Sequence, residues 1–386
     1  MTLSGEYSRD DVLAALEQVS QYGTPPRGRT RLLDVGSDHF CAYFERELIN
    51  GLTAFGGATT KFVEGEYGSG KTHLLDLLHE LAVDKGMGVV RADLTEVIGL
   101  QHWKQIVRHV LANLEAPIGG EVHRSLPAIL DAIAAQGSDA SDRLRRAALP
   151  HAGFVQAMRL RATDSGITGF ARDRLTQFLL GESVTVTELR NAGIDGVRNS
   201  LTEKNAEQVL RTVLTGLSKL GLPGVLLLFD ENERTFTFNR ERPPERVVRG
   251  ANLMRRFIDA CAAGGLSSTV AVFFVLPGFV QNCALAYAAL GQRLQRRTSQ
   301  VDGCAWRWPT LSIADVVSHL GPEAFVGAAA DRMCQLAEQC QPTAPDLLDR
   351  LTTEGHDVLR RHAGTGFRRP LMKRLATVTL QVLEPT

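Results

Sequence analysis

Eight consecutive residues have the types and spacing of a phosphate-binding loop, Gly65-Glu66-Tyr67-Gly68-Ser69-Gly70-Lys71-Thr72. They stand between a short β-rich run and a leucine-rich helical pattern that begins at His73, which is the context this P-loop motif requires. Gly68 and Gly70 allow the backbone to bend around a β-phosphate, with its amides pointing inward at the positive end of the following helix. The motif therefore predicts binding of ATP or GTP, with residues 65–73 in contact with the nucleotide. The alternative is a chance glycine-rich turn.

Two side chains at the end of this loop have predicted chemical roles. Lys71 is expected to reach the β- and γ-phosphates and to act in catalysis, and the hydroxyl of Thr72 is expected to ligate Mg²⁺. The sequence has no Asn-Lys-x-Asp run of the kind that recognises guanine. We therefore expect ATP and Mg²⁺ as the cofactors.

A pair of carboxylates ends a continuous apolar run downstream of the loop. Residues 224–229 are followed by Asp230 and Glu231, a pattern typical of a central parallel strand that opens on a phosphate site. Asp230 is expected to hold Mg²⁺ through water, and Glu231 to polarise the attacking water. The pair indicates an ATPase with an extra central strand rather than a kinase or a GTPase. The alternative is a buried strand that meets a solvated acidic turn.

Three arginines are candidates for contacts with the terminal phosphate. Arg293 lies in a helical pattern after a further apolar run, residues 267–276, where such ATPases carry an arginine that completes a neighbouring subunit's site. Arg368 and Arg369 follow a glycine turn, as in the second sensor of AAA+ proteins, and Arg369 has the Gly-x-x-Arg spacing. A surface arginine is the alternative in each case. Leu276 occupies the place where a polar sensor is expected.

The remaining pattern predicts an α/β fold of the P-loop NTPase class (ASCE/AAA+-like), with a parallel sheet, a large helical insertion and a C-terminal helical lid. We expect an N-terminal helical and linker region over residues 1–58. The P-loop ATPase domain spans 59–311, and the lid spans 312–386. Within the ATPase domain, residues 95–220 have mainly helical periodicity and form the insertion between two strands.

Composition places limits on the class of protein. The 386 residues are 44% hydrophobic and 22% charged, as in globular chains of two or three domains. Lys+Arg and Asp+Glu number 43 each, so there is no overall basic field, although a local basic face is left open. The six scattered cysteines include no CxxC pair, the start is not that of a signal peptide, and no apolar run reaches about 18 residues. We therefore expect a cytoplasmic protein without a membrane partner.

Several stretches resemble one protein family, namely Gly23-Thr24-Pro25-Pro26-Arg27-Gly28, Val35-Gly36 and the run from Lys61 through the P-loop to Leu75. They are similar to the ATP-binding protein family of bacterial BREX phage-defence systems, a branch of the AAA+ ATPases. Asp230-Glu231 and the stretch from Tyr287 to Arg293 also stand where that family would place its acidic pair and its arginine. The resemblance implies an ATPase that works beside helicase or methyltransferase partners on DNA.

Two functions of different classes follow as hypotheses. The first is an ATP-hydrolysing motor or loader that assembles with copies of itself or with defence-system partners, using Arg293 in trans. The second is an ATP-gated scaffold or DNA-binding regulator with little turnover, in which the lid closes through Arg369. A kinase is a third interpretation, disfavoured because Glu231 suits the activation of water.

Overall fold

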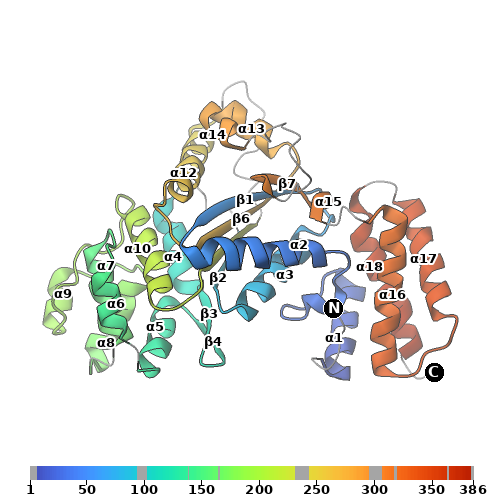
Figure 1. The fold of residues 1–386 in the computed structure, drawn as a ribbon, viewed down its shortest axis with the longest axis horizontal. Coiled ribbons are helices and arrows are strands. Elements are labelled where there is room, and N and C mark those ends of the chain that lie inside the picture. The colour runs from blue at the N-terminus through green and yellow to red at the C-terminus, as the bar shows by residue number, and fades with distance from the viewer. Residues whose placement is uncertain are drawn as a thin grey trace.

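The computed structural model describes residues 7–93, 102–137, 139–163, 166–230, 243–294, 307–316, 320–362 and 365–383. The fold is mixed α/β, with one seven-stranded sheet at its centre. Figure 1 shows the helices of the insertion beyond one end of this sheet and the C-terminal helices beyond the other. None of the helices within the described ranges combines the length and apolar character that crossing a bilayer would take.

The sheet is mostly parallel and has the strand order β4-β3-β2-β5-β6-β1-β7. The strand that enters the P-loop, β1, pairs in parallel with β6 and β7, while β5 lies in parallel between β2 and β6. The bounds are β1 Ala58–Glu64, β2 Gly88–Asp93, β3 Glu115–Ile118, β4 Glu121–Arg124, β5 Val225–Asp230, β6 Thr269–Val275 and β7 Thr310–Ser312. The predicted central strands are therefore confirmed, and β6 separates the P-loop strand from the strand that ends in Asp230.

The central strands are apolar because both faces of the sheet are covered. All six residues of β5 are buried; Leu226 and Leu228 pack on one face, and Leu227 and Phe229 on the other. This explains why β5 reads as an unbroken apolar run rather than as an alternating one. The bounds of the helices on the first face are α2 Asp38–Tyr43, the π-helical segment Phe44–Leu52 and α3 Lys71–Asp84, and those on the second are α4 Trp103–Asn113, α10 Ala206–Lys219 and α12 Glu245–Ala262.

A row of stacked aromatic rings crosses the sheet. Phe62 of β1, Phe273 of β6 and Phe229 of β5 are register partners, and their ring centroids lie 5.1 and 4.5 Å apart. Such cross-strand pairs hold a register in place. Because Gly65 and Asp230 follow Phe62 and Phe229 closely, the row aligns the start of the P-loop and Asp230 at one edge of the sheet.

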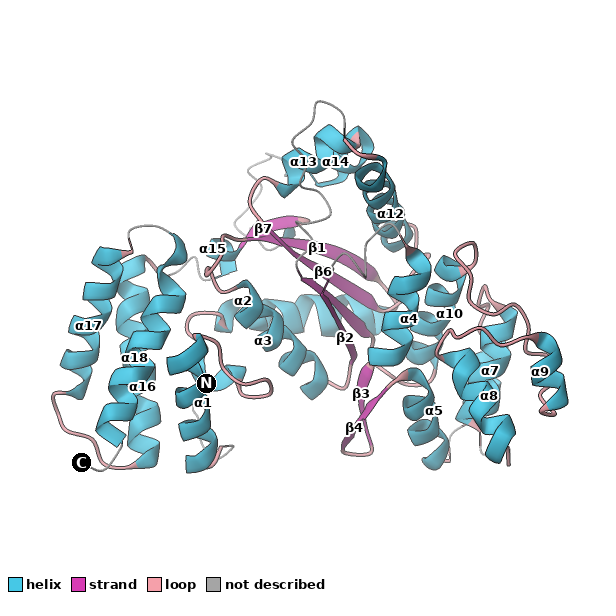
Figure 2. Ribbon diagram, turned by 180° about the vertical axis from the view of Figure 1, so that it is seen from behind, coloured by secondary structure: helices cyan, strands magenta, loops and turns pink. Residues whose placement is uncertain are grey.

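The chain between β2 and β5, where the sequence predicts a mainly helical insertion over residues 95–220, contains mostly helices among its described residues. A β3–β4 hairpin, which that expectation did not include, extends the sheet (Figure 2). Its turn is Gly119-Gly120, with φ of 63° and 88°, the backbone that two-residue hairpin turns require. The further helices are α5 Leu126–Ala135, α6 Ala140–Arg146, α7 Ala152–Ala162, α8 Gly169–Leu179 and α9 Val186–Asn191.

The first helix, α1 (Arg9–Tyr22), packs with the last ones. Its N-terminus has a capping box between Ser8 and Asp11. Its apolar face shares a core with α16 and α18, so α1 belongs by packing to the C-terminal helices. The remaining helices are α13 Phe279–Ala286, α14 Ala288–Leu294, α15 Ile313–Val316, α16 Pro322–Cys340, α17 Leu347–Arg361 and α18 Arg368–Leu383. The domain boundaries at 58 and 311 stay predictions.

Candidate functional site

The P-loop joins β1 to α3 through backbone that only glycine adopts without strain. Gly68 has φ 77° and Gly70, the N-cap of α3, has φ 103°, so side chains at either position would be strained. At Gly65 the constraint is space, because a Cβ there would lie 2.5 Å from Ser69 Oγ and 3.0 Å from Ile313. The glycine spacing of the motif therefore has a local structural cause at all three positions.

Lys71 folds back over the loop to which it belongs. Its ammonium donates to the Gly65 carbonyl at 2.6 Å and to the Glu66 carbonyl at 3.3 Å. It also lies 5.4 Å from the centroid of the Tyr67 ring, and this ring is 73% exposed. A phosphate oxygen carries a full negative charge and accepts a stronger hydrogen bond from an ammonium than a carbonyl does. The position of Lys71 is thus compatible with an exchange of loop carbonyls for phosphate oxygens.

The loop opens on a cavity of about 350 Å³, within the range of 300–1,000 Å³ common for small-molecule sites. Its lining is mixed: one part comes from residues 66–74 of the loop and α3, and another from apolar side chains of α1, α16 and α18 with the segment between α1 and α2. These apolar side chains include Val19, Leu33, Val35, Phe325 and Met372. The cavity therefore offers both an anion site and an apolar surface.

Asp230 also lines this cavity and is only 9% exposed. It ends β5, two strands away from β1 and at the same edge of the sheet. The P-loop and Asp230, which follow two strands separated by β6, therefore line the same cavity. Glu231, the predicted catalytic base, lies outside the described residues.

The residues present fit a magnesium ion bound together with phosphate. Thr72 and Asp230 line one cavity and supply a hydroxyl and a carboxylate. Within the described ranges no group of three or more His, Cys, Asp or Glu side chains could hold a metal. Mg²⁺ commonly binds through one or two protein oxygens, with phosphates and waters as its other ligands. Ser69 Oγ, buried in the loop, has no hydrogen-bond partner among the described atoms, so the loop holds a further unused polar atom.

The two lid arginines have different partners. Arg368 donates to the Ser69 carbonyl of the P-loop at 3.1 Å, and its guanidinium lies 5.0 Å from the centroid of the Phe325 ring. Burial lowers the pKa of Arg368, as expected for a cation held out of water. Arg369 donates instead to the Tyr22 carbonyl at the end of α1, at 3.0 and 2.7 Å. Both arginines line the cavity. Arg368 makes the contact with the P-loop, whereas the Gly-x-x-Arg spacing favours Arg369 as the second sensor.

Arg293 of α14 is held within the chain. It forms an ion pair with Asp259 of α12, with Nη2 at 3.1 Å from the carboxylate, and Nη1 donates to the Ala289 carbonyl at 2.7 Å. Asp259 also binds Arg255 at 3.2 Å. Arg293 does not line the cavity of its own chain. This position is compatible with an arginine that acts on a neighbouring subunit.

His73 connects the P-loop helix to the segment before α2. Its Nε2 lies 3.1 Å from Asp34 Oδ1, and Asp34 is nearly buried. Burial acts to raise the pKa of Asp34, but hydrogen bonds from His73 and Ser37 and the charge of Arg332 outweigh it and lower this pKa. Asp34 is therefore an ionised carboxylate next to the end of the loop. His73 itself lines the cavity.

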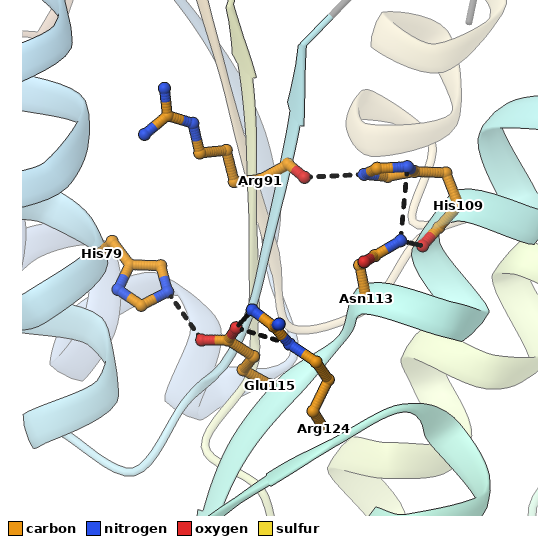
Figure 3. A network of polar contacts seen from close by, with 6 residues as sticks. All are labelled: His79, Arg91, His109, Asn113, Glu115 and Arg124. Atoms are coloured by element: carbon orange, nitrogen blue, oxygen red, sulfur yellow. Dashed lines mark hydrogen bonds and ion pairs between the residues drawn. The ribbon is translucent and has the colours of Figure 1, made fainter. Parts of the chain in front are cut away.

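The opposite flank of α3 is fixed by a polar network that includes the hairpin (Figure 3). His79 of α3 lies 3.1 Å from Glu115 of β3, which also accepts from Arg124 of β4. On the other side of β2, His109 Nε2 donates to the Arg91 carbonyl at 2.7 Å. α3 is thus tied to the added strands of the insertion as well as to the central sheet.

The end of β6 brings no polar side chain to the cavity. Its last residue, Val275, accepts from Gly65 N at 3.0 Å, and Leu276 and Pro277 follow. Neither Leu276 nor Pro277 lines the cavity. The apolar lining residues escaped sequence reasoning because they come from α1, α16 and α18, whose helical patterns indicate only a core.

Comparison with known families gives one match. The family model described as "BREX system ATP-binding protein BrxC/D" matches residues 6–140 and 151–305, well over half of the chain. No curated protein matches the chain.

Proposed function

Because the chain belongs to the BREX system ATP-binding protein family, and is thus an ATP-binding protein of a phage-defence system, we propose that it is a Mg²⁺-dependent AAA+-type ATPase. It couples ATP hydrolysis to partners that act on DNA, and it assembles with copies of itself or with other proteins of that system. One observation carries the proposal: the P-loop with Lys71, and Asp230 at the end of β5, line one cavity.

The lining suggests how the nucleotide is placed. The triphosphate binds the P-loop amides and Lys71, and the base packs against the apolar side chains of α1, α16 and α18. Thr72 and Asp230 would hold Mg²⁺, which would neutralise charge on the phosphates. Glu231, next to Asp230 in the chain, orients and deprotonates the attacking water. The strand order, with β6 between β1 and β5, supports the ASCE class of P-loop ATPases.

The proposal is tested by the steady-state rate of ATP hydrolysis of the purified chain, with and without Mg²⁺ and duplex DNA. A rate above background that requires Mg²⁺ and rises with DNA supports it. A second candidate, the ATP-gated scaffold or regulator, is favoured by Leu276 at the expected place of a polar sensor. For that function, ATP binds while hydrolysis stays at background with DNA and partner proteins present.

Arg368 is proposed as the lid residue that senses the γ-phosphate, because it is the lid arginine that contacts the P-loop. We expect Arg368→Ala to weaken ATP binding about tenfold while ADP binding changes little, since only ATP carries the γ-phosphate. Titration of both nucleotides measures this ratio. Arg369→Ala, which removes the contacts with Tyr22 instead, is the matched control. If the ratio of ATP affinity to ADP affinity changes only in Arg369→Ala, the role belongs to Arg369, as its Gly-x-x-Arg spacing suggests.

Arg293 is proposed to complete the site of a neighbouring subunit. Arg293→Ala should leave ATP affinity near normal but slow hydrolysis in the assembled protein by about 10³-fold, as for arginine fingers. Hydrolysis rates measured across protein concentration reveal the dependence on assembly. Arg255→Ala, which removes the other partner of Asp259, is the control. An equal loss of rate in dilute monomer would make Arg293 a structural residue.

A further inference from the structure

The segment Thr30–Asp34, here called the strap, lies between the P-loop helix and the lid. On the α3 side, Glu80 accepts from the backbone amides of Thr30 at 2.8 Å and of Arg31 at 3.3 Å. Asp84 binds the Arg31 side chain. With the His73 contact to Asp34, three side chains of α3 hold the strap. Positions 73, 80 and 84 have the i, i+7, i+11 spacing of one helix face, so α3 presents a polar stripe to the strap.

The lid holds the same segment from the other side. Arg332 of α16 donates from Nε to the Leu32 carbonyl and from Nη2 to the Arg31 carbonyl, each at 2.8 Å. Arg332 is half-buried, and this burial lowers its pKa. Leu32 and Leu33 are buried in the core that α1, α16 and α18 share. The strap therefore packs with the lid through apolar contacts and the hydrogen bonds of Arg332, and it meets α3 through polar contacts.

The strap also continues into a wall of the nucleotide cavity. Leu33 of the strap and Val35 and Ser37, which follow it, line the cavity, whereas Glu80 and Arg332 do not. A wall that is fixed before the ligand arrives costs no ordering free energy on binding. Anchors that never touch the ligand can therefore still affect its affinity.

We propose that Glu80 and Arg332 are positioning residues, which set the strap between α3 and the lid and thereby shape the cavity for the nucleoside part of ATP. This inference rests on the proposed nucleotide site. Glu80 is suited to the task because one carboxylate accepts from two successive amides. Arg332 does the converse and donates to two successive carbonyls. Movement of the lid on α3 then has to break the polar contacts of His73, Glu80 and Asp84, since the apolar side of the strap stays with the lid.

The test compares Glu80→Ala, Glu80→Gln and Arg332→Gln with Glu17→Ala, which removes an exposed carboxylate from α1. Hydrogen exchange without nucleotide should show the Thr30 and Arg31 amides exchanging about tenfold faster in Glu80→Ala, because their acceptor is gone. In Glu80→Gln the exchange rates should lie between those of Glu80→Ala and the wild type, since the single amide oxygen accepts from one of the two backbone amides. Glu17→Ala should match the wild type.

Nucleotide affinity separates positioning from a merely structural role. Glu80→Ala and Arg332→Gln should each weaken ATP and ADP about tenfold and to the same extent, since the cavity wall meets the part that both nucleotides share. The turnover of bound ATP should not change. Faster strap exchange with unchanged affinities would overturn the inference while the proposed ATPase stands. Should Glu80→Ala fail to fold, Arg332→Gln tests the strap from the lid side. A wild-type chain that binds no nucleotide would overturn both.

Discussion

Replacement of Lys71 by alanine should abolish measurable ATP binding, with a loss of affinity of at least a hundredfold and little loss of fold. Lys71 is the cation of the loop itself, and hydrogen bonds from a charged donor to phosphate contribute about 1.5–3 kcal/mol each. It contacts two loop carbonyls, Gly65 and Glu66. When ATP binds, Lys71 is expected to exchange these two carbonyls for at least two phosphate oxygens. The loss of two such hydrogen bonds costs about 2.7 kcal/mol or more, which corresponds to at least a hundredfold loss of affinity. Isothermal titration with ATP and Mg²⁺ measures the effect.

The fold is expected to survive because Lys71 is only partly buried and its partners are carbonyls of a solvent-facing loop. Circular dichroism and the thermal midpoint check this. Lys219→Ala is the matched control, since it removes an exposed ammonium from the end of α10. An unchanged affinity for ATP in Lys71→Ala would refute the assignment of residues 65–72 as the triphosphate site, whatever happens to hydrolysis.

Glu231→Gln should stop hydrolysis while ATP binding stays intact. Asp230 ends β5 and lines the cavity, and in the acidic pair of such ATPases the second acid polarises the attacking water. A general base contributes about 10²–10⁴-fold to a rate, and glutamine has nearly the same shape but cannot take up the proton. We therefore expect the turnover rate to fall at least a hundredfold at saturating ATP. Phosphate release and equilibrium titration measure the two quantities separately.

Glu233→Gln gives the control, because it changes the same group two residues further along the chain. The outcome decides between the two functions as well. If Glu231→Gln abolishes hydrolysis but retains phage defence in cells, the ATPase motor is wrong and the ATP-gated scaffold stands. If it retains hydrolysis, Glu231 is not the base and the acidic pair has been misassigned.

Sequence reasoning succeeded where a local rule determines the structure. The P-loop needs glycines at positions of positive φ, and β5 is apolar because it is covered on both faces. These features depend on neighbours in the chain or on a general property of buried strands. The Gly119-Gly120 turn of the hairpin stands within a mainly helical pattern, which concealed the hairpin signal.

What the sequence could not indicate depends on contacts between distant residues. Arg368 and Arg369 are adjacent, and their spacing from the glycine turn favours the second. The orientation of each side chain depends on a distant acceptor. Arg368 donates to the Ser69 carbonyl, and Arg369 donates to the Tyr22 carbonyl. The same holds for Glu80 and Arg332, which look like ordinary surface charges on two amphipathic helices. No pattern in either helix shows that a third segment runs between them.

The packing of α1 against α16 and α18 has a consequence for the synthesis of this protein. The contact between Arg332 and Leu32 spans 300 positions of the chain. At 5–20 residues per second, a ribosome needs roughly 15–60 s to cover that distance. Throughout this interval the helices that later bury the apolar face of α1, with Val12, Leu16 and Val19, have not yet been synthesised. The apolar face of α1 is therefore open to non-native apolar contacts for longer during synthesis than the faces of α16 and α18 that cover it.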